Sequence, residues 1–148
     1  MATTGVFNGT SLVVLIGGEV IAYSTSCSLS IAIDAPDASN KESLGWADEI
    51  GGQRSWSLTT DGLATVSPTT VVATYVSLPE LTTLAIARTA VTVMFTTVTA
   101  GTATPIVDDA KWTGQAFIES VDMTADMENP VTYSVSFKGT GVLTQSKN

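Results

Sequence analysis

Two groups of acidic residues stand out as side chains whose type and spacing could support catalysis or metal binding. One is the pair Asp108-Asp109, and the other is the cluster of Asp122, Asp126 and Glu128. Paired carboxylates can hydrolyse glycosides at defined separations, and carboxylate oxygens can bind Ca²⁺. However, Asp108-Asp109 lies at an expected turn, and the cluster lacks the spacing of a calcium-binding loop. We interpret these acids as solvated, and we expect no catalytic residue, no metal site and no cofactor.

The composition argues against several other kinds of chemistry. The chain has no histidine, which removes Ser-His-Asp and Cys-His catalysis and histidine metal sites. Its single cysteine, Cys27, cannot form an internal disulfide and alternates with Leu29 and Ile31, so we expect a buried structural thiol. The net charge of −8 is opposite to that of a typical nucleic-acid-binding domain. We therefore expect a protein that is not an enzyme and does not bind nucleic acid specifically.

The sequence also gives no sign of export or membrane insertion. No basic segment precedes the first apolar run, so a signal peptide is not expected. That run, Leu12–Ile16, is far too short to span a bilayer. The product is therefore expected to be made and assembled in the cytoplasm, without membrane insertion.

The elements that must position these residues are expected to be mostly strands. The chain contains 24 threonines and 15 serines, a composition typical of β-structure, and its length of 148 residues fits one domain. Only 14% of the residues are charged, below the usual quarter. This shortage indicates that partners cover much of the surface.

The last third of the chain shows the clearest pattern. Alternating runs over Lys111–Ala125 and Pro130–Leu143 flank a turn at Glu128-Asn129-Pro130. A period of two predicts two paired strands, each with one buried face. On the second run the polar positions are almost all hydroxyl groups, namely Thr132, Ser134 and Ser136, followed by Lys138. Such a face is typical of a surface that something packs on or slides past.

Other segments contain local signals for turns, a helix, loops and further strands. Gly17-Gly18 predicts a tight hairpin, and Ser77 with Glu80 forms a capping box that begins a helix over Leu78–Ala87. Residues 1–10 are expected to form a flexible N-terminal arm, and residues 35–52 a long interface loop. Further strands are expected at residues 12–16, 19–23, 25–34, 54–60, 63–66, 70–76 and 91–98, with a turn at Asp61-Gly62.

Trp46 and Ile50 are apolar residues inside the polar loop at residues 35–52, and they need cover. They could fold back on their own sheet, or they could insert into a neighbouring subunit, since tryptophan is enriched among interface anchors. The sequence leaves both possibilities open.

Two blocks of the sequence resemble the major tail proteins of bacteriophages, which form the tail tube. The first runs from Lys41-Glu42-Ser43 through Gly45-Trp46 and Ser55-Trp56-Ser57 to Asp61-Gly62. The second is the segment from Asn129 to Gly141, NPVTYSVSFKGTG. The resemblance covers roughly residues 11–143, including the helix and the strand between the blocks. Lys138 departs from the family pattern, which often has an acid at this position.

The resemblance implies a mainly β protein, an antiparallel sandwich or partly closed barrel with one flanking helix. It implies homohexameric rings that stack into a hollow tube of the virion tail and conduct DNA during ejection without binding it specifically. Other tail proteins, such as the tape measure, tail tip and terminator, would be partners. Related tubes occur in contractile injection systems. The alternative is a monomeric adhesion or decoration module of a virion.

The polar strand faces supply the candidate residues for the wall of such a tube. These lumen-facing candidates are Ser26, Ser28, Ser30, Ser55, Ser57, Thr59, Ser120, Asp122, Thr124, Asp126, Thr132, Ser134 and Ser136. They include two acids and no base, so the bore would repel DNA. The candidates for contacts between subunits are Lys41, Trp46, Ile50 and Arg54.

Overall fold

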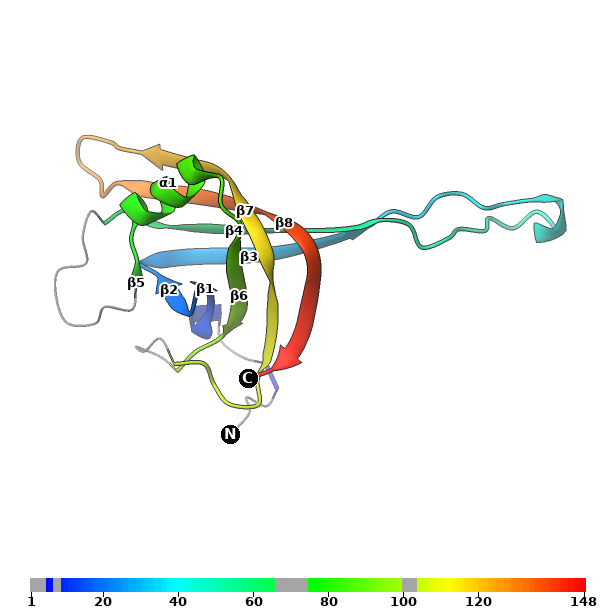
Figure 1. The fold of residues 1–148 in the computed structure, drawn as a ribbon, viewed down its shortest axis with the longest axis horizontal. Helices are drawn as coiled ribbons and strands as arrows, with labels where there is room; N and C mark the ends of the chain where they lie inside the picture. Colours follow the sequence, from blue (N-terminus) through cyan, green and yellow to red (C-terminus); the bar gives the residue numbers. More distant parts are fainter. Residues whose placement is uncertain (1–4, 7–8, 66–74, 100–103) are drawn as a thin grey trace.

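The computed structural model describes residues 5–6, 9–65, 75–99 and 104–148. The chain forms one curled sheet with a helix against it and a long hairpin that projects away from the body (Figure 1). The strands are β1 (Leu12–Ile16), β2 (Glu19–Ile21), β3 (Ser24–Ile33), β4 (Arg54–Leu63), β5 (Tyr75–Val76), β6 (Val91–Thr97), β7 (Ala110–Thr124) and β8 (Thr132–Lys147). The helix is α1 (Leu78–Ala87), and short 3₁₀ turns cover Gly9–Ser11 and Lys41–Ser43.

The sheet is antiparallel except at one edge. Its strand order is β3-β4-β8-β7-β6-β1-β2-β5, and among the strands described only the two-residue β5 pairs in parallel, with β2. The strands β7 and β8 are long enough to bend, so the sheet curls around its own core (Figure 1). This half-closed barrel with one helix confirms the expected fold class.

The core fills the inside of this curl. Leu58, Val135 and Phe137 are fully or almost fully buried, and Leu81 from α1 packs against the same cluster. The helix begins at the capping box, where the backbone N–H of Ser77 donates to Glu80 Oε2 at 2.7 Å. Such a box satisfies backbone groups that a helix start leaves open, which explains why α1 begins at Leu78.

Several expected boundaries differ in the structure. Asp61 and Gly62 continue β4 instead of forming a turn, because they pair with β8 as far as Leu63. The last strand was expected to end at Leu143, but β8 continues to Lys147, where its backbone pairs with β7. Most of the expected N-terminal arm (residues 1–4 and 7–8), the expected strand at 70–76 up to residue 74, and residues 66–69 and 100–103 lie outside the described residues.

Candidate functional site: a hydroxyl-rich sheet face and two open edges

Four strands bring most of the expected polar residues onto one face. Cross-strand pairing aligns Ser28 of β3, Thr59 of β4, Ser136 of β8 and Ser120 of β7 in one continuous row. The side chains that alternate with this row, such as Leu58 and Phe137, point into the core. Register in a sheet with one buried face places every second residue on the same side, so the hydroxyl positions of distant segments become neighbours.

Neighbouring rows complete this surface, which we call the hydroxyl face. One row contains Ser30, Ser57, Lys138 and Phe117, and the next contains Ser26, Asp61, Ser134 and Asp122. The last row is formed by Leu63, Thr132 and Thr124. Of the predicted residues, Ser55 lies further along β4 beside Ala32, and Asp126 lies beyond the end of β7, so these two are outside the four rows.

The candidate residues for the tube wall left out two charges on this face. Asp61 was assigned to a turn, although it continues the alternation of Ser55, Ser57 and Thr59. Alternation had placed Lys138 on the same face as Thr132 and Ser134 without making it a candidate, and the full burial of Phe137 beside it confirms that Lys138 points outward. The hydroxyl face thus carries acids and one base, whereas the candidate list contained acids alone.

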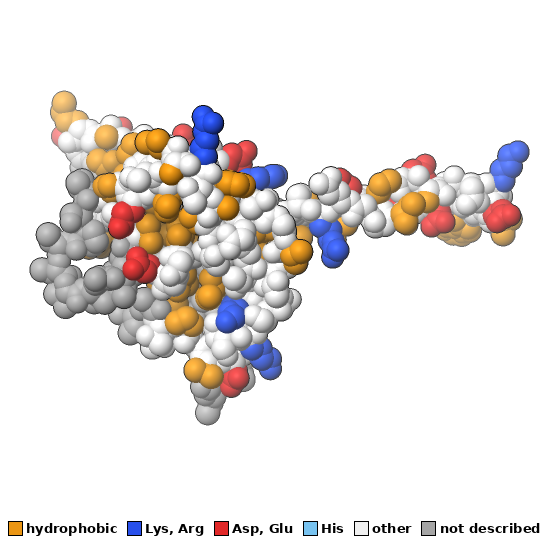
Figure 2. Space-filling model, in the orientation of Figure 1, with side chains coloured by type: hydrophobic (Ala, Val, Ile, Leu, Met, Phe, Trp, Pro, Cys, Tyr) orange, Lys and Arg blue, Asp and Glu red, His pale blue; other side chains and the backbone are white. Residues whose placement is uncertain are grey.

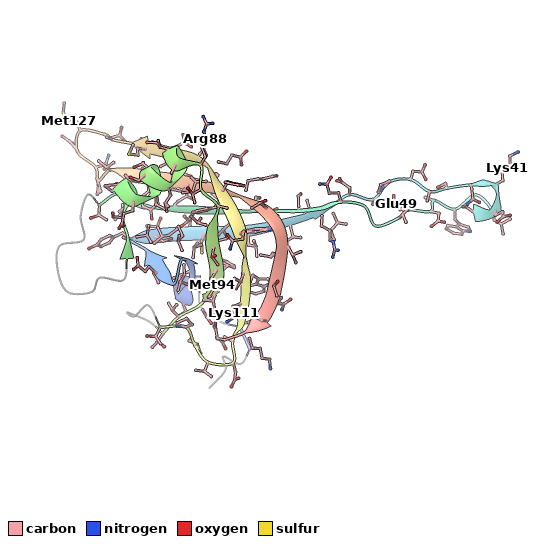
Figure 3. The ribbon with its side chains drawn as sticks, viewed as in Figure 1. Lys41, Glu49, Arg88, Met94, Lys111 and Met127 are labelled. Carbon is pink, nitrogen blue, oxygen red and sulfur yellow. The ribbon has the colours of Figure 1, made fainter. Side chains whose placement is uncertain are left out.

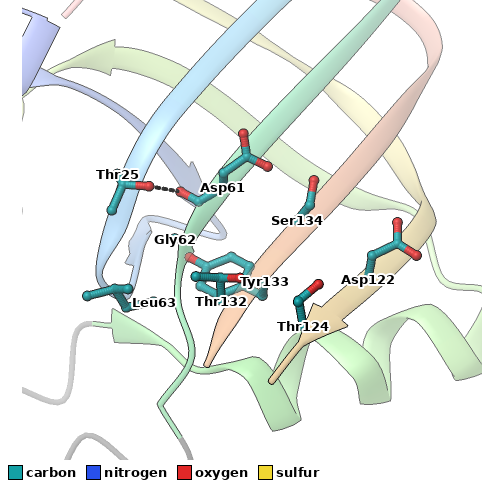
Figure 4. Close-up of a pocket in the computed structure, with 9 residues that line it drawn as sticks. All are labelled: Thr25, Asp61, Gly62, Leu63, Asp122, Thr124, Thr132, Tyr133 and Ser134. Carbon is teal, nitrogen blue, oxygen red and sulfur yellow. Dashed lines mark hydrogen bonds between the residues drawn. The ribbon is translucent and has the colours of Figure 1, made fainter. Parts of the chain in front are cut away.

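A shallow hollow of about 370 Å³ lies at one end of the hydroxyl face (Figure 4). Asp61 and Asp122 flank Ser134 there, and Ser26 Oγ donates to Asp61 Oδ2 at 2.9 Å. Thr25 Oγ1 donates to the Asp61 carbonyl oxygen at 3.2 Å. This open, hydroxyl-lined hollow has no arrangement of nucleophile and base.

Tyr133 supports the hollow from behind. Its phenol donates to the carbonyl oxygen of Ala22 at 2.9 Å, which ties β8 to the chain after β2. Burial, and then the negative charge of Asp61, raise the pKa of Tyr133 to about 12. The ring passes so close to Gly62 that a Cβ there would collide with the phenol oxygen. The glycine in β4 is therefore needed for this contact.

The four-stranded part of the sheet ends in two open edges. In the part of the chain that the structure describes, β3 pairs with β4 alone, and β6 pairs with β7 over residues 111–116 but not beyond. Within the described residues, the stretch of β7 from Phe117 to Thr124 therefore has a partner, β8, on one side alone. Open edges of this length expose backbone donors and acceptors that favour pairing with another chain.

The projecting hairpin carries most of the candidates for contacts between subunits. We call residues 34–53 the arm; it continues the direction of β3 and β4 away from the body (Figures 1 and 3). Trp46 is 81% exposed and Ile50 is 62% exposed, while Lys41 lies at the tip. Both apolar side chains therefore extend into solvent, and they do not fold back on their own sheet. Arg54 lies where the arm joins β4.

The expectation that the acids are solvated is wrong for Asp109, which is buried at 7% exposure because its carboxylate accepts a hydrogen bond from the Thr97 hydroxyl. No group of three or more acidic, cysteine or histidine side chains in the part of the chain described could hold a metal ion. Cys27 is half-buried, its thiol donates to the Leu12 carbonyl oxygen at 3.3 Å, and burial raises its pKa. None of the helices described is long and apolar enough to cross a bilayer.

The sequence profile of the phage tail tube proteins matches residues 17–145, which is most of the chain. The chain belongs to the phage tail tube protein family. Outside this family profile, no curated protein sequence matches it.

Solved structures show the same fold for this tail tube protein. It is similar to the tail of an empty gene transfer agent particle with C6 symmetry, at 19% identity and a TM-score of 0.75, covering 95% of this chain and 99% of that one. The SPP1 tail tube gives a TM-score of 0.70 at 10% identity over 97% of this chain and 80% of that one. The sheath–tube complex of an extracellular contractile injection system gives 0.68 at 14% identity over 97% and 93%.

Proposed function

We propose that six copies of this tail tube protein close into a ring, and that stacked rings form a hollow tube in the virion tail through which DNA passes. The observation that carries this proposal is the pair of open edges on the four-stranded part of the sheet. The six-fold symmetry of a similar tail supports the number of copies.

The two edges have the right direction to join. β3 is antiparallel to β4, β4 to β8, and β8 to β7, so β3 and β7 run in opposite directions. A rotation about a ring axis preserves strand direction along that axis, so β3 of one copy would meet β7 of the next as an antiparallel pair. Head-to-tail contacts of this kind close when the rotation is a fraction of a full turn.

Closure would give a barrel wide enough for DNA. Six copies of four strands make 24 strands, and strands lie about 4.8 Å apart, so the circumference is about 115 Å and the diameter roughly 37 Å before tilt widens it. The core lies against one side of the sheet, and so the hydroxyl face would line the bore. Short, mostly uncharged side chains leave this bore open and give phosphate groups few basic contacts.

The arm would contact the adjacent ring. It projects along the strand direction, and its exposed Trp46 and Ile50 are not buried by its own body, so a neighbouring subunit would bury them. Buried tryptophans are frequent anchors of protein interfaces. Tape measure, tail tip and terminator proteins would meet the ends of such a stack.

The decisive experiment combines negative-stain electron microscopy with native mass spectrometry over a concentration series, with and without a tail-tip template. Rings or tubes with six-fold end views are the expected result. A protein that stays monomeric even with the template would contradict the proposal and favour a monomeric adhesion or decoration module.

A further inference from the structure

An apolar groove lies at the base of the arm, on the side of the sheet opposite the hydroxyl face. It has a volume of about 700 Å³, and its lining includes Ile31, Ile33, Arg54, Trp56, Val142 and Leu143. Figure 2 shows a basic side chain below the base of the arm, with apolar side chains on the body beside it. Ile31 pairs with Trp56, which is buried in the core, and Ile33 pairs with Arg54. Alternation along β3 and β4 therefore places these four side chains together on the core side of the sheet.

The groove exposes apolar side chains that its own chain does not cover. Ile31 and Ile33 are 54% and 60% exposed, and Val142 is 81% exposed. Exposed apolar residues that gather in one place mark interaction surfaces. A partner that fills the groove would remove these side chains from water, which favours binding.

Arg54 is the one charged side chain among the residues that line the groove in the described chain. Asp34 follows Ile33 but does not line the groove. The other acids of the arm begin at Asp37 and Glu49, at least three residues further out, or roughly 10 Å at the rise of a strand. This separation exceeds the screening length of about 8 Å at physiological salt. The groove therefore fits an apolar side chain that has a carboxylate next to it.

The turn between β7 and β8 carries this combination of groups. We call residues 125–131 the tip. Met127 is fully exposed there, and Glu128 beside it is exposed as well. The tip contains a second acid, Asp126, and no basic residue. Methionine is unbranched and flexible, so it adapts to irregular apolar surfaces. The tip is thus complementary to the groove in both hydrophobicity and charge.

The tip and the groove lie at opposite ends of the same strands. β4 begins at Arg54 in the groove and ends at Leu63, which pairs with Thr132 directly after the tip. The ten residues of β4 span roughly 33 Å. Figure 3 labels Met127 at the end of the molecule away from the arm. One chain cannot bring its own tip to its own groove, but two copies placed end to end along the strand direction can.

We infer that Met127 inserts into the groove of a second copy in the adjacent ring, where Glu128 pairs with Arg54. This inference rests on the proposed stacking of rings and assigns a second contact, beside the arm, to the same end of the ring. Each copy has one tip and one groove, so the contact is head-to-tail and repeats from ring to ring. Burial of Met127 against Ile31 and Ile33 supplies apolar contact, and the charge pair sets the register between rings.

A charge swap tests the pair of Arg54 and Glu128. Arg54→Glu should raise the protein concentration needed for tube growth about tenfold, and so should Glu128→Arg, because like charges then face each other. Both substitutions in one chain should restore growth to within about threefold of the original protein. Arg88→Glu is the matched control, since Arg88 is an exposed base at the end of α1, and it should leave growth unchanged.

Met127 allows a second test that involves no charge. Met127→Gln keeps the length of the side chain but makes it polar, so it should raise the concentration needed for growth several-fold. Met127→Leu keeps the side chain apolar and should grow within about twofold of the original protein. Because Met127 is fully exposed, neither change should alter the melting temperature, and thermal unfolding checks this for every variant.

Failure of the swap to restore growth, or equal growth of the glutamine and leucine variants, would overturn the inference. The wild-type tubes would still support the proposed function in that case. If the wild-type protein forms no tube even with a template, the proposed function itself fails, and this contact fails with it.

Discussion

Two glycines and one tryptophan allow the long strands to bend behind the hydroxyl face. Gly114 of β7 and Gly139 of β8 lie under the indole of Trp56, and a Cβ at either position would overlap its ring. The indole N–H donates to the Gly141 carbonyl oxygen at 3.2 Å, and Gly141 itself has a positive φ of 80°. The bend of β8 and the position of Trp56 are thus determined together.

Replacing Gly139 by alanine should destabilise the protein. The added methyl group collides with the indole inside a packed region, and overpacking of this kind costs about 1–3 kcal/mol in the free energy of unfolding. Chemical denaturation measures this change. Gly51→Ala is the control, because a Cβ there meets nothing within 4 Å. Equal stability of the two variants would show that Trp56 moves aside without cost.

The raised pKa of Tyr133 predicts that the folded protein loses stability in strong alkali. Its pKa of about 12 in the folded protein exceeds the ordinary value of about 10, so the folded state holds the proton more tightly than the unfolded chain does. The stability from this group is complete below about pH 10 and is lost as the pH rises through 12.

Replacing Tyr133 by phenylalanine should cost about 1 kcal/mol at neutral pH, since the Ala22 carbonyl oxygen loses its donor. It should also flatten the dependence of unfolding free energy on pH between 10 and 12. Urea denaturation at several pH values measures both effects. An alkaline loss in the variant as steep as in the original protein would assign it to other groups.

At the scale of elements, different interactions hold the arm and the body together. Backbone hydrogen bonds hold the two sides of the arm together, such as Asp34 N–H to the Gln53 carbonyl oxygen at 2.9 Å, but few side chains of the arm are covered. The buried residues that hold the body together lie in the sheet and in α1. The arm therefore contributes little to the stability of the body.

Shortening the arm should separate stacking from folding. Because Asp34 and Gln53 face each other at its base, residues 35–52 can be replaced by Asn-Gly, which favours a two-residue hairpin turn. We expect the melting temperature to stay within about 4 °C and tube growth to be lost. Calorimetry and electron microscopy measure the two properties. Normal tubes from the shortened protein would mean that ring stacking does not use the arm.

At the scale of the whole molecule, both the charge of the proposed ring and the smoothness of its bore would affect DNA passage. Six copies with a net charge of −8 each carry a formal charge of −48, yet the hydroxyl face itself has only a few charges, including Lys138. Smoothness of the proposed bore would therefore matter for DNA passage at least as much as repulsion does.

Basic substitutions at two acids that we propose to face the bore should slow the passage of DNA. Replacing Asp122 and Asp126 by lysine adds phosphate contacts along the bore, so ejection from virions should become several-fold slower, and added salt should relieve the effect. Replacement by asparagine removes charge without adding a base and should have a smaller effect. Time-resolved measurement of DNA release tests this, with electron microscopy to confirm intact tubes. Unchanged release from the lysine variant would place these residues away from the bore.

The sequence by itself determined the local elements and the family. The capping box at Ser77 and Glu80 began the helix where expected, and Gly17-Gly18, both with positive φ, formed the expected hairpin. These features depend on neighbouring residues, which the sequence shows directly. Alternation likewise identified most members of the hydroxyl face, because one buried face determines where every second residue points.

Only the tertiary structure decided which of these segments lie side by side. The register of β4 against β8 placed Asp61 on the hydroxyl face, although it had been assigned to a turn, and it set Lys138 beside Ser57. The free edges of β3 and β7 and the projection of Trp46 into solvent also depend on long-range pairing. Residues far apart in the chain make these contacts, and a periodic pattern contains no information about which strand will pair with which.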